Sequence, residues 1–557
     1  MLISEFLHNI TNKALEDLLK AKGIDTNNSP DFIIEKPKNS DFGDFATSLP
    51  LQLSKLLSSN PMEIAENLVS LLPDCKEIEK LSIAKPGFIN FSLSKNWINN
   101  EIKMILVSEK DYGRPLEAKN FKIQVEFVSV NPTGRLHLGH MRGAVIGSTI
   151  ANLLENQRFN VQREYYVNDA GNQMQIFGNS IIERIKEANG ADFNVSEDHY
   201  KGEDIIEIAK ELAPNYKNYN LENVEDSTFN EIKNKAKDKC ILKIKDDLNL
   251  IKIKHDSWFY ESSLIDSNYF SDTLQNLDDL NLTYKKDDAL WIKTEELGDE
   301  RDNVLVKSSD KKPTYFATDI AYHRNKFEVR NFEKVIDLWG ADHHGHIKRM
   351  EIILEKLGID SKKLIVLLNQ IVSLKSSSGI SKFSKREGTS ILLKDLVGEI
   401  GSDACRFSFI SRSPESQMEI DIDIFKKQSS ENPVFYIQYA HARLSSILRS
   451  SEYFKIKFDD ADINLLISPD EINLIKKLIE YPELLNRITE NLNVHELSTY
   501  SLELAQIIHK FYEKNRVIDE DLANIEQTKS RLLLVKASKI ILSNLLSLMG
   551  MESPEKM

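Results

Sequence analysis

Cysteine is scarce in this sequence, which holds only Cys75, Cys240 and Cys405 among 557 residues. No two of them form a CxxC pair, so a structural zinc site is not expected, and the low count is typical of a protein from the reducing cytoplasm. No run of roughly 18 apolar residues occurs, so no membrane span is expected. The opening residues, MLISEFLHNI, carry Glu5 where a secretory signal would carry cationic residues. We therefore expect a cytoplasmic protein with no structural metal and no membrane partner.

A phosphate-binding P-loop is also missing, because no GxxxxGK[ST] string appears. The formal net charge of −14 does not favour a nucleic-acid partner, although a local basic patch can serve one on an acidic protein. Hydrophobic residues make up 41% and charged residues 28% of the chain, as in ordinary globular proteins with sizeable cores. The length predicts three or four domains, since domains usually hold roughly 100–200 residues.

Periodicity divides the chain into three units. Residues 1–114 combine helical patterns with the alternating segment LSIAKPGFINFSLS, which predicts a hairpin or edge strand in an α+β domain. Residues 429–557 are helical in pattern almost throughout, which predicts an all-α domain.

The middle unit, residues 115–428, opens with the apolar alternation NFKIQVEFVSV, a Gly/Pro turn and the helical segment HLGHMRGAVIGSTIANLLENQ. Strand, turn and helix in this order predict a Rossmann-like parallel sheet. Residues from about 185 to 310 are richer in Asn, Lys and Asp and are interpreted as an insertion. KVIDLWG and LIVLLNQIVSL return to the sheet, with a helix predicted from His346 to Leu357. The expected fold class is therefore multidomain α/β.

The strongest local signal is the string His137-Leu138-Gly139-His140 at the start of the predicted helix. Amide groups at a helix N-terminus favour anions, and glycine lets a phosphate approach the backbone. The two histidines can donate hydrogen bonds to charge that develops on an α-phosphate. The alternative is that they merely cap the turn.

A second signal is Lys382-Phe383-Ser384-Lys385-Arg386, in a segment rich in Ser and Gly. Two lysines on such a loop suit a mobile clamp on a polyphosphate. Alone, the string would more often be a solvated surface loop. In combination with the histidine string it is far more specific.

HLGH and KFSKR resemble the two signature motifs of class I aminoacyl-tRNA synthetases, written HIGH and KMSKS in that family. Longer blocks are similar to those of arginyl-tRNA synthetases, and the similarity runs essentially from end to end. Leu138 and Phe383 replace the family's isoleucine and methionine, and neither change removes a charged or hydrogen-bonding group. The similar blocks include EFVSVNPTGRLHLGHMRGAVIG, REYYVNDAGNQ, LWGADHHGH, KREGTSILLKDLVGEIGSDACRF, NPVFYIQYAHAR and, in the N-terminal unit, GDFATSLPLQLSK.

The resemblance implies an arginine–tRNA ligase, which converts ATP, L-arginine and tRNA(Arg) into arginyl-tRNA(Arg), AMP and diphosphate through an arginyl-adenylate. It assigns His137 and His140 to the α-phosphate, and Lys382 and Lys385 to the leaving pyrophosphate. Mg²⁺ is expected with ATP, held mostly by phosphates and water. The resemblance further places the following residues at ATP: Pro132, Thr133, Gly134, Gly139, Arg142, Asp342 and His343.

Arginine requires a carboxylate that accepts its planar guanidinium in a bidentate fashion. By resemblance Asp319 is the best candidate and Glu261 a second, while Tyr315 shares a helical face with Asp319 at the i, i+4 spacing. Glu126 and Asn131 would hold the amino group and the substrate end of the cleft. The alternatives are a core tyrosine, a capping aspartate and ordinary turn chemistry.

Three histidines in GADHHGH, namely His343, His344 and His346, could suggest a metal site. No cysteine or paired carboxylate set accompanies them, so no metal is expected. By resemblance this loop lies near the ATP ribose.

Aromatic and arginine side chains alternate at helical spacing in the C-terminal unit and could stack on anticodon bases. Each aromatic alone is more often a core residue. By resemblance Phe88 and Asn90 would meet the tRNA elbow, and a monomer is expected. The C-terminal candidates are Tyr436, Tyr439, Arg443, Tyr512 and Arg516.

Three other functions compete with this interpretation. A class I synthetase for another amino acid would lack the set formed by Tyr315, Asp319 and Glu261, or would carry an editing insertion. A nucleotidyltransferase with an HxGH fold would be shorter and would need no helical C-terminal domain. A catalytically inactive tRNA-binding relative would not retain both histidines and both lysines.

Overall fold

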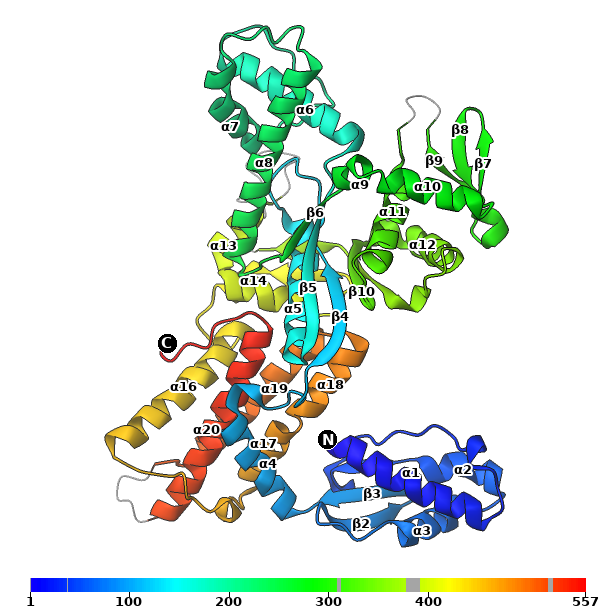
Figure 1. Ribbon diagram of the computed structural model, residues 1–557. Helices are drawn as coiled ribbons and strands as arrows, with labels where there is room; N and C mark the ends of the chain where they lie inside the picture. The colour runs from blue at the N-terminus through cyan, green and yellow to red at the C-terminus, as the bar shows by residue number, and fades with distance from the viewer. Residues whose placement is uncertain (1, 38, 308–311, 377–390, 519–523) are drawn as a thin grey trace.

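A parallel sheet lies at the centre of the molecule and orders its five strands β11-β10-β4-β5-β6 (Figure 1). The computed structural model describes residues 2–37, 39–307, 312–376, 391–518 and 524–557. The Rossmann-like fold class expected from the sequence is confirmed by this sheet. The strands are β4 (Lys119–Glu126), β5 (Phe159–Val167), β6 (Ser257–Tyr260), β10 (Lys334–Gly340) and β11 (Leu364–Asn369).

Helix α5 (Leu138–Asn156) follows β4 and packs on one side of the sheet. The apolar side chains of β4, Ile123 and Val125, share a core with this helix, whereas Gln124 and Glu126 alternate with them. Gly147 allows the helix to approach closely, because a Cβ at this position would lie 2.4 Å from a ring carbon of Phe127. The sequence order of strand, turn and helix is found as predicted.

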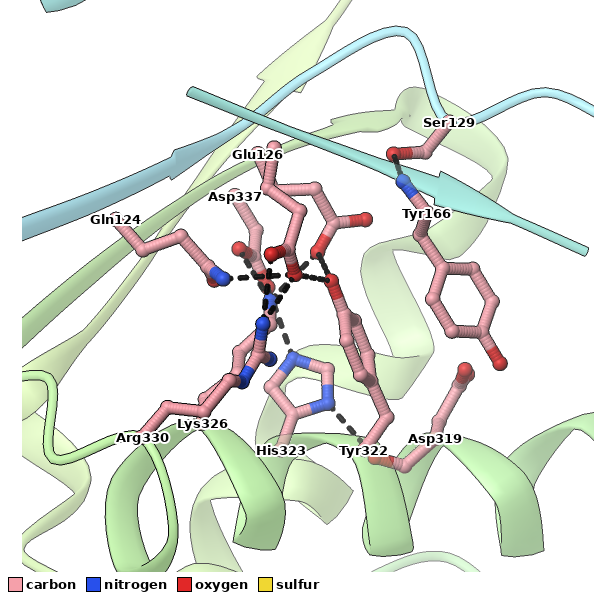
Figure 2. Close-up of polar contacts among 11 residues, drawn as sticks. Gln124, Glu126, Ser129, Tyr166, Asp319, Tyr322, His323, Lys326, Arg330 and Asp337 are labelled. Atoms are coloured by element: carbon pink, nitrogen blue, oxygen red, sulfur yellow. Dashed lines mark hydrogen bonds and ion pairs between the residues drawn. The ribbon is translucent and has the colours of Figure 1, made fainter. Parts of the chain in front are cut away.

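Helices α11 (Tyr315–Glu328) and α12 (His344–Lys356) belong to a second core. This core joins Ile320 of α11 and Ile353 of α12 to Val335 of β10. The helix predicted from His346 to Leu357 is found as α12. As a result, α11 lies against the sheet face that carries Gln124 and Glu126 (Figure 2).

The stretch between β5 and α11 holds two excursions rather than one. Helices α6, α7 and α8 form a core of their own, and a three-stranded antiparallel sheet, β7-β8-β9, accompanies α9 and α10. The predicted insertion at about 185–310 is thereby split, because β6 returns to the parallel sheet as an edge strand inside this range. The bounds are α6 (Gly171–Ala188), α7 (Glu203–Leu212), α8 (Asp226–Leu250), α9 (Ser262–Asp266), α10 (Tyr269–Asp279), β7 (Thr283–Lys286), β8 (Ala289–Ile292) and β9 (Asn303–Val306).

The N-terminal part of the chain forms an antiparallel sheet, β1-β3-β2, beside three helices. The segment predicted as a hairpin or edge strand folds as β2 paired with β3. Helix α4 leads from this unit to the central sheet (Figure 1). The bounds are α1 (Ile3–Ala21), β1 (Phe45–Thr47), α2 (Leu49–Leu57), α3 (Pro61–Leu71), β2 (Ile78–Ala84), β3 (Phe88–Leu93) and α4 (Lys95–Ser108).

The C-terminal part is a group of helices, as its periodicity predicts. Between it and β11, the described residues form a two-stranded parallel sheet, β12 with β13, and the helices α13, α14 and α15. The connecting elements are β12 (Val372–Lys375), α13 (Leu393–Ile400), α14 (Ser402–Ile410), β13 (Met418–Asp421) and α15 (Ile422–Phe425). The C-terminal helices are α16 (Pro433–Tyr453), α17 (Pro469–Ile479), α18 (Tyr481–Asn491), α19 (His495–Lys514) and α20 (Ile525–Leu548).

The buried Arg406 of α14 joins the C-terminal helices to the part that contains the parallel sheet. Its guanidinium donates to the Met549 carbonyl after α20, to the Ile251 carbonyl after α8 at 2.8 Å and to Ser148 Oγ of α5 at 3.2 Å. Three elements distant in sequence are therefore fixed to one side chain. Within the described ranges, no helix combines the length and the apolar character that a bilayer crossing requires.

Candidate active site

A cavity of about 660 Å³ opens at the carboxyl ends of β4, β5 and β10. In parallel α/β sheets, ligands bind at this edge. The loops that follow the strands and the first turn of α11 supply its walls. Of the residues predicted from the sequence, the cavity brings together Glu126, Asn131, Gly139, His140, Tyr315, Asp319 and His343.

His137 and His140 lie at the N-terminus of α5, with ring centroids 3.7 Å apart. The Nδ1 of His137 accepts a hydrogen bond from the Gly139 amide at 3.2 Å, and the Nδ1 of His140 accepts one from the His137 amide at 3.3 Å. Burial lowers the pKa of both rings, that of His140 to about 3. Both rings are thus neutral near pH 7 and carry their proton on Nε2. Capping and donation are compatible, because each ring caps with one nitrogen and keeps an N–H on the other.

Two carboxylates from the helical insertion fix the turn that precedes these histidines. Asp204 accepts the Arg135 amide at 3.0 Å, and Asp247 accepts the Leu136 amide at 3.2 Å and pairs with the Arg135 guanidinium. A Cβ on Gly134 would lie 3.0 Å from Asp204 Oδ2. The predicted ATP residues Pro132, Thr133 and Gly134 belong to this turn but do not line the cavity itself.

The expectation that Arg142 contacts ATP requires correction. Its side chain is buried, and its guanidinium donates to the backbone carbonyls of Gln370, Ser413 and Ser416 at 2.6–3.2 Å. These bonds hold α5 to the segments after β11 and α14. Arg142 therefore supports the helix of the histidines without facing the cavity.

Asp319 lines the cavity one helical turn after Tyr315, as the i, i+4 spacing predicts. Burial raises the pKa of Asp319 to about 6. Glu261 is buried next to the cavity wall, and burial followed by the charge of Asp319 raises its pKa to about 7. Within the described residues, neither carboxylate forms an ion pair. Asp319 lines the cavity, and Glu261, which does not line it, is buried near Asp319.

Further polar side chains line the cavity. The Asn131 side chain donates to Gln173 of α6, and Glu126 reaches the floor beside Tyr322 (Figure 2). His343 lines the cavity, and Asp342 belongs to the same single turn, Ala341–His343. The described residues contain no group of three potential metal ligands. Lys382 and Lys385 lie outside the described residues.

Several cavity residues were not predicted from the sequence. Tyr166, Asn168 and Trp339 stand at the ends of β5 and β10, where the rule for parallel sheets could have found them. Tyr322 and His323 lie one turn after Asp319 on α11, and no local pattern distinguishes them from core residues.

Three of the five predicted tRNA residues of the C-terminal part, namely Tyr439, Arg443 and Tyr512, form one cluster, in which both tyrosines are exposed and Arg443 is half-buried. The Arg443 guanidinium lies 4.7 Å from the ring centroid of Tyr439 and 4.5 Å from that of Tyr512, and it donates to the Tyr439 hydroxyl at 2.9 Å. Tyr439 is 38% and Tyr512 42% exposed. Tyr436 packs on His509 and is half-buried, while Arg516 is exposed farther along.

The two N-terminal candidates differ in accessibility. Phe88, at the start of β3, is partly exposed. Asn90, two residues later, is buried in the sheet and offers almost no surface. Direct contact of the Asn90 side chain with a nucleic acid is therefore not favoured by its burial.

Comparison with known proteins gives matches along the whole chain. Residues 101–415 match the family described as tRNA synthetases class I (R), catalytic domain; residues 5–93 match the arginyl tRNA synthetase N terminal domain, and residues 437–557 the DALR anticodon binding domain. Among curated proteins, the chain is 42% identical to an arginine–tRNA ligase of Dehalococcoides mccartyi over 95% of this chain and 94% of that one. It is 41% identical to arginine–tRNA ligase 1 of Halalkalibacterium halodurans over 97% of each. The fold is similar to that of Thermus thermophilus arginyl-tRNA synthetase, with a TM-score of 0.78, 19% identity and complete coverage of both chains.

The raised pKa of Asp319 predicts a titration that can be observed without any ligand. The carboxyl should ionise near pH 6 rather than near 3.8, because burial disfavours its charged form. A group with a raised pKa in the folded state costs stability as pH rises through that value. Asp319→Asn should therefore gain stability relative to the unchanged protein between about pH 4 and pH 7.

Difference infrared spectra of the two proteins measure the titration, and urea unfolding at each pH measures the stability. Glu328→Gln, on the same helix but at the surface ion pair with Arg324, serves as the control. A carboxyl of Asp319 that ionises near pH 4 would contradict the assignment of a buried, uncompensated acid.

Proposed function

The chain belongs to the arginyl-tRNA synthetase family, and we propose that the cavity at the end of β4 is where it activates arginine with ATP. The overall reaction is that of an arginine–tRNA ligase: ATP, L-arginine and tRNA(Arg) give arginyl-tRNA(Arg), AMP and diphosphate. The observation that best supports the choice of substrate is the pair formed by Asp319 and Glu261. Both have raised pKa values, and neither forms an ion pair within the described part of the chain. A guanidinium is the planar, permanently charged partner that such a pair suits.

In the first step, an oxygen of the arginine carboxylate attacks the α-phosphorus of ATP. A new bond forms between them, the bond from the α-phosphorus to the bridging oxygen breaks, and pyrophosphate leaves. Positioning and stabilisation of charge carry such a reaction. The Nε2–H groups of His137 and His140 are assigned to the α-phosphate, since both rings hold this tautomer.

The leaving pyrophosphate is assigned to Lys382 and Lys385, on the sequence motif alone. Mg²⁺ would accompany ATP and neutralise phosphate charge. It would be held mostly by phosphates and water, because Mg²⁺ dehydrates reluctantly. In the second step, a terminal ribose hydroxyl of the tRNA attacks the adenylate carbonyl, and AMP leaves.

The substrate lies across the cavity in this proposal. Asp319 and Glu261 bind the guanidinium, with Tyr315 as an aromatic wall. Glu126 accepts the α-ammonium group, and Asn131 closes the same end. A class I synthetase for another amino acid is disfavoured. A neutral substrate side chain would leave the two acids buried without a cationic partner, which costs free energy, and an acidic side chain would add repulsion between like charges.

For tRNA, we assign the cluster of Tyr439, Arg443 and Tyr512, in which both tyrosines are exposed, to stacking on anticodon bases. Aromatic and guanidinium planes at an accessible surface suit this contact. Phe88 is assigned to the tRNA elbow. A cytoplasmic monomer stays a prediction from the sequence, as do the domain limits 1–114, 115–428 and 429–557.

The substrate assignment is tested by Asp319→Asn, which keeps the volume and removes the charge. The arginine KM should rise about 100-fold, since truncation of a buried charged pair costs about 2–5 kcal/mol. Discrimination against citrulline, whose side chain is neutral, should fall in parallel. Glu328→Gln on the same helix should change neither quantity. An unchanged arginine KM in Asp319→Asn, with unchanged discrimination, would remove Asp319 from the site.

The tRNA surface is tested by Tyr512→Ala. Binding of tRNA(Arg) should weaken by about tenfold or more, because stacking on one base contributes about 1–3 kcal/mol. Arginine binding to the free enzyme should be unchanged. Arg449→Gln is the matched control on α16, where the guanidinium contacts Glu555 of the C-terminal tail rather than the cluster. If Tyr512→Ala and Arg449→Gln bind tRNA equally well, the cluster does not contact the anticodon.

A further inference from the structure

Three carboxylates stand side by side on the sheet face beneath the cavity. Glu126 of β4 is the register partner of Glu164 on β5 and of Asp337 on β10. Register partners in a parallel sheet point to the same face, so the three acids form a row across adjacent strands. All three are buried. Like charges in such a row are destabilising unless cations reach them.

Helix α11 and the residues after it supply these cations (Figure 2). Lys326 is completely buried, and its Nζ lies 2.6 Å from Glu126 Oε2 and 2.8 Å from Asp337 Oδ1. Arg330 pairs with Glu164 at 2.6 Å. Lys326 therefore bridges two of the three acids, and among the described residues it is the only cation paired with Glu126.

His323 also contacts this network. Its Nε2 lies 2.8 Å from Asp337 Oδ2, and its Nδ1 lies 2.8 Å from the backbone carbonyl of Asp319. Lys326 and His323 together hold the pKa of Asp337 low against the effect of burial. Lys326, Arg330 and His323 therefore all contact the row of three carboxylates.

The carboxylate of Glu126 is held from one side only. Its Oε2 accepts a hydrogen bond from Lys326 and lies 2.9 Å from the Tyr322 hydroxyl, whose single proton is shared with Glu164 Oε1 at 2.5 Å. No hydrogen bond from a described residue reaches its Oε1, and Glu126 lines the cavity. One oxygen is thus fixed below, while the other is available to a substrate above.

We propose that Lys326 is a positioning residue for the amino group of the substrate. It keeps Glu126 ionised and fixes the direction of its free oxygen, so that the α-ammonium meets a prepared acceptor. This inference rests on the proposed function, in which Glu126 binds that group. Lys326 itself does not touch the substrate, because Glu126 and Tyr322 lie between it and the cavity.

A merely structural role would predict a different outcome. A buried ion cluster can often be replaced by apolar residues without loss of stability, and a structural lysine would affect all ligands of the cavity alike. A positioning lysine affects only ligands that carry the α-amino group. The two roles are therefore separated by comparing arginine with 5-guanidinopentanoic acid, its analogue without the amino group.

The experiment measures the affinity of both ligands for the full chain by titration calorimetry. In Lys326→Met the preference for arginine over the analogue should fall by at least about tenfold, the scale of one charge-assisted hydrogen bond, whereas affinity for the analogue should change little. Arg324→Met is the matched control, since Arg324 lies on the same helix, pairs with Glu328 and has no contact with the network. It should keep the preference.

A double substitution tests whether Lys326 acts through Glu126. Glu126→Gln alone should lower the preference, and Lys326→Met added to it should lower it no further. If Lys326→Met does not fold, Lys326→Met with Asp337→Asn removes one charge of each sign and should show the same lost preference. A preference equal to that of the unchanged protein, in whichever variant folds, would overturn the proposal.

The pH dependence of the same preference gives a further readout. Burial already raises the pKa of Glu126, and loss of Lys326 should raise it more. The preference in Lys326→Met should therefore decline as pH falls, starting at a higher pH than in the unchanged protein. The titrations of Asp319 and Glu261 affect the binding of both ligands, because both ligands carry the guanidinium group. Their effect therefore cancels in the ratio of the two affinities. The groups that face Glu126 are Glu164, Tyr166, Asp319, Tyr322, Lys326 and Asp337.

The two hypotheses fail in distinguishable ways. If the unchanged protein binds neither arginine nor its analogue, the proposed function fails. If it binds both and prefers arginine, but Lys326→Met retains that preference, only the role of Lys326 fails.

Discussion

A row of three buried carboxylates across β5, β4 and β10 constrains the catalytic part of this protein, because it can exist only if cations are buried with it. Helix α11 supplies Lys326, His323 and Tyr322 to the contacts with this row. The same contacts fix the helix against the sheet, and its first turn, which carries Tyr315 and Asp319, is thereby held at the cavity. Stability of the sheet and geometry of the substrate site consequently depend on one network.

Much of the catalytic unit could be predicted from the sequence, because the patterns that indicate its elements lie within short stretches of the chain. Apolar alternation, a Gly/Pro turn and small residues at helical spacing follow one another between β4 and α5, and the two histidines stand at that helix start. The i, i+4 spacing of Tyr315 and Asp319 likewise places both at the cavity. The family membership implied by the longer sequence blocks is confirmed by matches along the whole chain. The roles of the individual residues stay proposals.

The remaining features depend on contacts between segments distant in the sequence. Arg142 is a residue type that often binds phosphate, yet its guanidinium donates hydrogen bonds to three backbone carbonyls from two later segments. The short strand β6 follows a helical excursion, so that only its pairing with β5 identifies it as part of the parallel sheet. Lys326 has no local pattern at all, since its partners, Glu126 and Asp337, lie on two other elements. The burial of Arg142 and Lys326 cannot be inferred from the type of residue alone.

The central claim is that a cleft lined by Asp319, with Glu261 buried beside it, selects arginine for activation by ATP. Pyrophosphate release from ATP, measured with each of the twenty amino acids in the presence and in the absence of tRNA(Arg), tests it most directly. The account predicts release with arginine and only background with the other nineteen, lysine included, because an ammonium cannot contact both acids as a planar guanidinium can. Comparable release with another amino acid, or none with arginine when tRNA is present, would contradict it.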